Sequence, residues 1–100
     1  MSFKRFVLIC EYESVKTILE HYGSHDAVLS IDVNKVSHVG DLFPIRFDPT
    51  REQAKVTLLL RAENSNLIRE HISSHIMEQF AGRVIFYVIS LPDVQTHSVE

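Results

Sequence analysis

Short apolar segments alternate with amphipathic ones along this chain, and the alternation predicts its architecture. Residues 6–10 and 56–60 are almost uninterrupted apolar runs, which is typical of strands buried on both faces. In residues 84–91 every side chain except Ser90 is apolar or aromatic, and a proline follows. Residues 27–36 alternate between apolar and polar side chains, as a half-buried strand does. The pattern predicts four strands.

Two helices are predicted between these strands, because apolar residues recur there with helical spacing. Gly23 stands where the first helix needs a left-handed C-cap. Asn64 and Ser65 are good N-cap residues for the second helix, which Gly82 ends. The first helix is predicted over residues 14–22, with an apolar stripe of Val15, Ile18, Leu19 and Tyr22. The stripe of the second helix is Leu67, Ile68, Ile72, Ile76 and Phe80.

The predicted order is β-α-β-β-α-β, in a single domain over residues 1–100. With right-handed crossovers this order gives an α+β, ferredoxin-like fold: an antiparallel sheet with both helices on one face and residues 6–10 and 56–60 in the middle. The last strand, residues 84–91, is then an edge strand, although both its faces are apolar. The other face of the sheet is left without cover. We therefore expect an oligomer whose sheets pack face to face.

The connection between the second and third strands, about residues 37–53, is far longer than an ordinary hairpin loop. It carries charged residues, and it also carries apolar ones, which distinguishes it from a flexible polar linker. The apolar residues include Leu42, Phe43, Ile45 and Phe47. Two interpretations are open: the loop is a lobe packed on its own domain, or it docks on a partner protein.

Composition and charge narrow the classes of function. The chain has 100 residues, of which 45% are hydrophobic, and this suits one ordinary globular domain. Its net charge of −3 gives no general attraction to nucleic acid or to an anionic membrane. Cys10 is the only cysteine, so an internal disulfide and a cysteine-based zinc cluster are excluded. No apolar run is long enough to span a membrane, and we expect a cytoplasmic protein.

No sequence motif supports an enzyme. The nucleophile elbow of hydrolases, the P-loop and the Gly-rich dinucleotide fingerprint are all absent from the sequence. Cys10 lies inside an apolar run, so we expect a small buried hydrophobic residue rather than a reactive thiol.

Two histidine pairs have a spacing that can place two imidazoles on one metal ion when it occurs on a helix. The pairs are His21 with His25 and His71 with His75. Each pair lacks a third ligand, and the second also lacks the glutamate of the zincin motif. Because His71 and His75 flank an apolar stripe, packing at its boundary is favoured over a metal site.

Several segments carry a resemblance to a known family. AVLSIDVNKVSHVG opens the long loop, AKVTLLLRAE follows it, and EQFAGRVIFYVIS follows the second helix. The tail QTHS is similar to the short Gly-His-Thr end of carboxysome-associated and bicarbonate-transport PII-like proteins. With the β-α-β-β-α-β order, the chain resembles the nitrogen-regulatory PII-like superfamily over nearly its whole length. The resemblance implies a homotrimer that binds an adenine nucleotide in each of three clefts between subunits and docks on partners through three long T-loops.

The family's functional positions can be carried over to this sequence. The base of the T-loop falls on Lys35, Ser37 and His38, and the phosphate-binding turn after the second helix falls on Gly82 and Arg83. A glycine allows a backbone N–H to approach a ligand, and a guanidinium offers a fork for phosphate oxygens. The alternative is that Gly82 only caps the helix and that Arg83 is a solvated strand residue.

The chain also departs from the family pattern. The turn Thr-Gly-x-x-Gly-Asp-Gly-Lys is shortened here, and the paired C-terminal arginines and the uridylylated loop tyrosine have no counterpart. Control through that tyrosine is therefore excluded, and ADP, AMP or cyclic AMP is favoured over ATP.

We expect a signalling protein rather than an enzyme, with ADP as the favoured effector and a partner protein regulated through the loop. A membrane transporter is one candidate partner. The alternative is a metal-binding trimer similar to PII-like or divalent-cation-tolerance proteins, since six histidines are available. A third class, a small ferredoxin-like enzyme or an assembly module, would bind none of these ligands.

Overall fold

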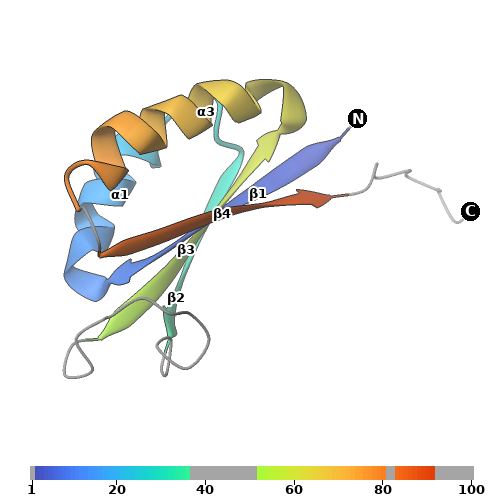
Figure 1. Ribbon diagram of the computed structural model, residues 1–100. Helices are drawn as coiled ribbons and strands as arrows, with labels where there is room; N and C mark the ends of the chain where they lie inside the picture. Colours follow the sequence, from blue (N-terminus) through green and yellow to red (C-terminus); the bar gives the residue numbers. More distant parts are fainter. Residues whose placement is uncertain (1, 37–51, 81–82, 92–100) are drawn as a thin grey trace, which may run out of the picture.

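The computed structural model describes residues 2–36, 52–80 and 83–91, and it arranges them in two layers (Figure 1). The first layer is an antiparallel sheet of four strands in the order β2-β3-β1-β4. The strands are β1 (Phe3–Glu11), β2 (Ser30–Val36), β3 (Gln53–Arg61) and β4 (Val84–Leu91). The second layer lies on one face of the sheet (Figure 1) and holds α1 (Val15–Tyr22) and α3 (Ser65–His71). This confirms the predicted α+β, ferredoxin-like fold.

The two central strands are the two that the apolar runs predict. Along β1, Phe6, Leu8 and Cys10 point into the core under the helices and are fully buried. Val7 and Ile9 point to the opposite face and are also buried, because β3 and β4 flank them on both sides. A continuous apolar run is thus explained by burial on both faces.

The helices cover the sheet with a narrower stripe than the sequence suggests. Ile18 and Tyr22 of α1 and Ile68 of α3 are fully buried. Leu19 and Leu67, which we expected in the stripes, are 39% and 57% exposed. Each directly adjoins a buried isoleucine, and neighbouring helix positions are turned about 100° from each other, so they point away from the core.

The second helix changes its winding before it ends. Short 3-10 turns, η1 (Tyr12–Ser14) and η2 (Ala62–Asn64), precede α1 and α3, and the π-helical segment η3 (Ile72–Met77) continues α3. In η3 the Ser74 hydroxyl donates to the Glu70 carbonyl at 2.8 Å and competes with the backbone for that acceptor. The expected second helix is therefore present over residues 72–77, with π-helical instead of α-helical winding. Gly82, its expected end, lies outside the described residues.

Gly23 ends the first helix, but not in the way that we expected. Its φ of −60° and ψ of −28° are right-handed rather than left-handed. The Gly23 N–H donates to the Leu19 carbonyl at 2.7 Å, and a Cβ atom on Gly23 would lie 2.6 Å from that oxygen. The glycine is needed for this close approach and not for a positive φ.

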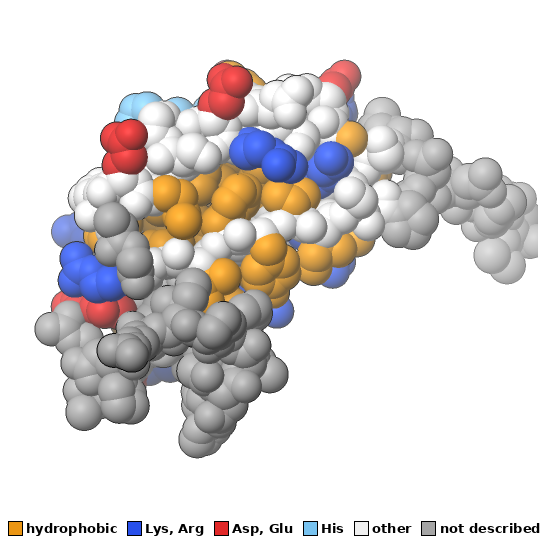
Figure 2. Space-filling view, viewed as in Figure 1, with side chains coloured by type: hydrophobic (Ala, Val, Ile, Leu, Met, Phe, Trp, Pro, Cys, Tyr) orange, Lys and Arg blue, Asp and Glu red, His pale blue; other side chains and the backbone are white. Residues whose placement is uncertain are grey.

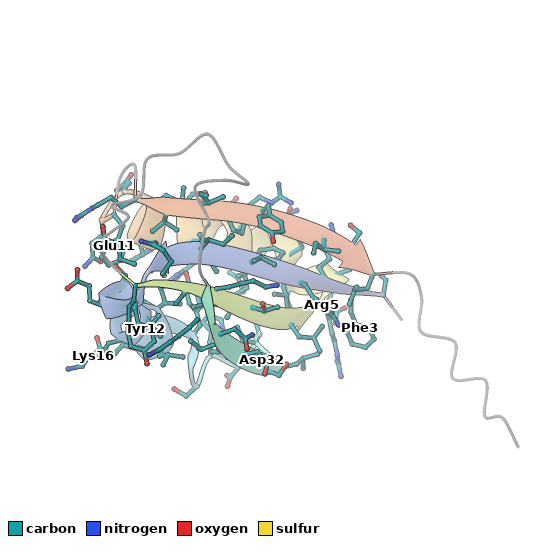
Figure 3. The ribbon with its side chains drawn as sticks, turned by 90° about the horizontal axis from the view of Figure 1, so that it is seen from below. Phe3, Arg5, Glu11, Tyr12, Lys16 and Asp32 are labelled. Atoms are coloured by element: carbon teal, nitrogen blue, oxygen red, sulfur yellow. The ribbon has the colours of Figure 1, made fainter. Side chains whose placement is uncertain are left out.

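The sheet face opposite the helices is partly apolar and has no covering layer in the described structure (Figure 3). Ile85 and Tyr87 of β4 flank β1 on this face, and Ile89 is 41% exposed. Figure 2 shows hydrophobic side chains gathered along both sides of β4, which is an edge strand. The predicted exposed apolar edge is therefore present. Residues 37–51 of the long loop lie outside the described residues.

The central strand offers a test of the core. Leu58 of β3 is fully buried among the helix-facing residues, and we expect Leu58→Ala to lower the free energy of unfolding by about 2–5 kcal/mol. Urea unfolding would measure it. Leu67→Ala is the matched control, and it should change that free energy by less than about 0.5 kcal/mol because Leu67 is exposed. Equal losses from both variants would contradict the described core.

Candidate functional site at the loop base

The ends of the long loop leave the sheet at the end where β4 begins. In the strand register, Lys35 lies beside Ala54, Ala54 beside Cys10, and Cys10 beside Val84. Lys35 on β2 and the start of β4 are therefore in one row but at opposite edges of the sheet. With neighbouring strands about 4.8 Å apart, the row spans roughly 14 Å. One chain alone does not bring Lys35 and Arg83 together.

Lys35 contacts two residues at the base of the loop. Its ammonium nitrogen lies 5.1 Å from the centroid of the Tyr12 ring and 3.5 Å from a Glu52 carboxylate oxygen. The Tyr12 N–H donates to the Glu52 carbonyl at 2.8 Å. Because the Lys35 and Glu52 side chains are mostly exposed, the ion pair contributes little to stability. Its role is geometric, since it joins the last residues of β2 to the chain just before β3.

Arg83 stands at the other edge, immediately before β4. Its N–H donates to the Phe80 carbonyl at 2.8 Å, so the start of β4 is bonded to the last described residue after the second helix. The Arg83 residue is exposed, and its guanidinium is available to a ligand. The other candidate residues, Ser37, His38 and Gly82, lie outside the described residues.

An open apolar groove of about 520 Å³ runs along the outer side of η1 and α1. It is lined by Tyr12, Glu13, Val15, Lys16, Leu19 and Glu20. Tyr12 is 44% exposed and also carries the Lys35 contact, so the groove and the loop base share this residue (Figure 3). Mostly apolar walls with a few charged groups at the rim are typical of small-molecule sites.

Sequence reasoning missed Tyr12 and Glu52. A single tyrosine between a strand and a helix shows no periodicity, and the register of β1 against β3 is needed to bring Glu52 to it. Tyr12 lies two residues after the apolar run 6–10, and Glu52 lies four residues before the run 56–60. This closeness to two predicted strands was the one sign that could have indicated a meeting point.

The two histidine pairs, which the sequence presents as separate, meet between the helices. The centroids of the His71 and His75 rings are 4.1 Å apart, and the His21 centroid is 5.4 Å from that of His71 and 5.8 Å from that of His75. The His25 centroid is 6.1 Å from that of His71. Within the described part of the chain, no group of three or more His, Cys, Asp or Glu side chains is placed to hold a metal ion.

Comparison with known proteins gives structural matches only. No family model and no curated protein matches the sequence. A crystal structure of a PII-like signalling protein from Thermus thermophilus is 13% identical and superposes with a TM-score of 0.67, over 91% of this chain and 87% of that one. The chain has the PII-like fold. A DUF3240-family protein from Shewanella baltica gives the same TM-score at 10% identity, over 100% and 99% of the two chains.

A further PII-like match is a structure of CPII from Thiomonas intermedia, bound to ADP, AMP and acetate. It is 14% identical, has a TM-score of 0.61, and covers 91% of this chain and 89% of that one. At this level of identity the comparison establishes the fold that the sequence predicted. In the described residues of this chain, no helix has the length and apolar character needed to cross a membrane.

On this PII-like fold the single cysteine lies in the core, as expected. Cys10 is fully buried, and burial, with the Glu11 carboxylate as a second cause, raises the pKa of its thiol to about 11. Nucleophilic chemistry requires the thiolate. Cys10 is therefore inert in the folded protein near neutral pH.

Thiol labelling tests this environment. We expect Cys10 to react negligibly with a disulfide reagent in the native protein at about pH 8, and rapidly in urea, where the pKa returns to its ordinary 9.0. Because the folded pKa lies above the unfolded one, this thiol adds stability below pH 9.0 that is lost as the pH rises through about 11. Fast labelling of the native protein, absent in Cys10→Ala, would contradict the described burial.

Proposed function

We propose that this chain is a divergent member of the PII-like superfamily, a signalling protein rather than an enzyme, that binds an adenine nucleotide and regulates a partner protein. The observation that carries the proposal is the fold shared with CPII, whose structure holds ADP and AMP. The exposed cationic side chains of Lys35 and Arg83, at one end of the same sheet, support an anionic ligand.

The nucleotide site lies between subunits. Within one chain Lys35 and Arg83 stand at opposite edges of the sheet, whereas a closed ring of subunits sets one surface of each chain against a different surface of its neighbour. Such a contact would bring Lys35 of one subunit to Arg83 of the next. Ser37, His38 and Gly82 complete the proposed site.

The charges and the groove favour ADP over ATP. Lys35 already shares its charge with Glu52 at 3.5 Å, and the sequence lacks the lysine-bearing turn and the paired arginines of the classical family. A site with fewer cationic side chains neutralises fewer phosphate groups of a ligand. The groove beside Lys35 offers the exposed Tyr12 ring as a surface for the adenine base.

The regulated partner binds through the long loop, residues 37–53, and a membrane transporter is one such partner. The buried free thiol of Cys10 suits the reducing cytoplasm, where we place the protein. A metal-binding trimer is the second candidate function, and the four neighbouring histidines favour it. Nucleotide binding is preferred because, among the described residues, no group of three or more such side chains is placed to hold a metal ion.

Calorimetry with ADP tests the role of Arg83. Because a charge-assisted hydrogen bond contributes about 1.5–3 kcal/mol, we expect Arg83→Ala to weaken ADP binding about ten- to a hundredfold. Adenosine, which has no phosphate, should bind the variant and the wild type alike. Arg69→Ala, which removes a charge from an exposed position on α3, is the matched control and should leave ADP affinity unchanged.

Two results would count against this site. Equal ADP affinity in Arg83→Ala and the wild type would mean that Arg83 is only a solvated strand residue and does not bind the nucleotide. No binding of any adenine nucleotide by the wild type at about millimolar concentration would remove the sensor function altogether.

Light scattering tests the assembly. The exposed apolar face predicts a homotrimer of about 35 kDa, three times the 11.5 kDa of one chain. Ile89→Lys places a charge on that face and should shift the mass toward one chain while the circular dichroism stays native. Leu67→Lys, at an exposed position on α3, should leave the mass unchanged. A monomeric wild type at micromolar concentration would contradict the assembly.

A further inference from the structure

Four histidines gather where α1 meets the second helix, and the proposed nucleotide site does not use them. His21 belongs to α1, His25 to the turn that follows it, His71 to the last turn of α3, and His75 to η3. Three of them, His21, His25 and His71, have ring contacts with Tyr22, a fully buried residue of the core, and His75 stacks on His71. We name these four residues the histidine cluster.

The central contact of the cluster joins the two helices. The Tyr22 hydroxyl lies 2.7 Å from Nδ1 of His71. Burial raises the pKa of Tyr22, so its hydroxyl keeps its proton. A buried hydroxyl needs an acceptor, and the Tyr22 hydroxyl therefore donates to an unprotonated Nδ1 of His71. This bond links residues that are 49 positions apart in the chain.

A second histidine also uses its Nδ1 atom as an acceptor. The Ala27 N–H donates to Nδ1 of His25 at 3.0 Å, and this bond fixes the turn between α1 and β2. An imidazolium carries a proton on both ring nitrogens and accepts no hydrogen bond. Protonation of His25 therefore places a donor opposite the Ala27 N–H, and that bond is lost. Protonation of His71 takes away the acceptor of the Tyr22 hydroxyl proton, and the phenol oxygen must then accept from the new Nδ1–H of His71.

The charges around His71 also oppose its protonation. Desolvation is the largest cause that lowers its pKa from 6.5, followed by the charges of His75, His21 and His25. These are the titratable groups that act on it from η3, from α1 and from the turn. The nearest acidic residues in sequence on those elements are exposed, and they are Glu20, Asp26, Glu70 and Glu78. The cluster is thus a set of neighbouring bases with no counter-charge that raises the pKa of His71.

A metal site is the competing use of four imidazoles. Metal binding requires an unprotonated nitrogen aimed at the ion. In His25 and His71 the acceptor nitrogen is Nδ1, and it is occupied by Ala27 and Tyr22. The His71 and His75 rings are stacked with an interplanar angle of 8°, so their edges do not converge. These contacts favour proton binding over metal binding.

We propose that the histidine cluster is a proton-operated latch between α1 and the second helix. With the imidazoles neutral, the Tyr22–His71 bond holds the helices together. As the pH falls, the charges of the bound protons repel one another, the Ala27–His25 bond is lost and the Tyr22 hydroxyl proton loses its acceptor, so the helix layer loosens while the sheet stays paired. The proposal does not depend on nucleotide binding.

The sign of the stability change follows from linkage. His71 has a lower pKa in the folded chain than in the unfolded chain, so the unfolded state binds more protons as the pH falls below 6.5. Its contribution is present above pH 6.5 and is lost as the pH falls through the lower, folded value. The latch therefore weakens on acidification.

Histidine NMR titration of the full chain tests the latch. In the wild type, the His71 ring proton should titrate at lower pH than in the urea-unfolded chain, and the Tyr22–His71 ring contact should disappear over the same pH range. Tyr22→Phe removes the donor to neutral His71, so His71 should then titrate at higher pH. Arg69→Gln, a charge change at an exposed position of the same helix, is the control and should leave the titration unchanged.

Thermal unfolding provides a second readout that does not need the ring signals. The wild-type Tm should fall by about 4 °C or more between about pH 7.5 and pH 5.5. In His71→Gln this fall should be clearly smaller. Both variants change one group at the cluster, and the wild-type titration keeps the proposal testable if either fails to fold.

Three outcomes would overturn the latch. The first is a His71 that titrates as it does in the unfolded chain, and the second is an unchanged Tyr22–His71 contact at low pH. The third is stoichiometric binding of Zn²⁺ or Cu²⁺ at about pH 7.5 that His71→Gln abolishes, because that would make the cluster a metal site.

Discussion

The pairing of β1 with both neighbouring strands is the constraint on which the rest of the structure depends. All nine residues of β1 are paired with β3, and eight of them also with β4. Residues 6–10 have apolar neighbours on both faces, so any shift of register by one residue would exchange the helix-facing and open-face side chains. The same register fixes which residues meet at the loop base.

Most of the fold could be predicted because buried apolar residues recur in the sequence with the spacing of a strand or a helix. The bounds of β4 are those of its apolar run, and Ile68, Ile72 and Ile76 mark the buried side of the second helix. The predictions that failed concern details that depend on single contacts, and a single contact leaves no periodic pattern in the sequence. The second helix becomes π-helical where the Ser74 hydroxyl bonds the Glu70 carbonyl, and the approach of Gly23 to the Leu19 carbonyl replaces the expected left-handed cap.

The candidate sites were harder to predict, because they join residues that are distant in the chain. The resemblance indicated Lys35 and Arg83, but only the strand order places them at opposite edges. The two histidine pairs were recognised separately, and each lacks a third ligand. Their meeting depends on how α1 packs beside α3 over the sheet, which spacing along one helix does not encode.

The apolar β4 edge has a consequence for how the protein is made. A newly synthesised chain that completes its own sheet still presents the outer backbone groups of β4 to any other chain, and apolar side chains lie on both sides of them (Figure 2). In the proposed assembly, correct subunits and unrelated strands would therefore compete for this edge. The yield of native protein would then depend on how soon sister chains meet, and synthesis from closely spaced ribosomes on one messenger would favour them.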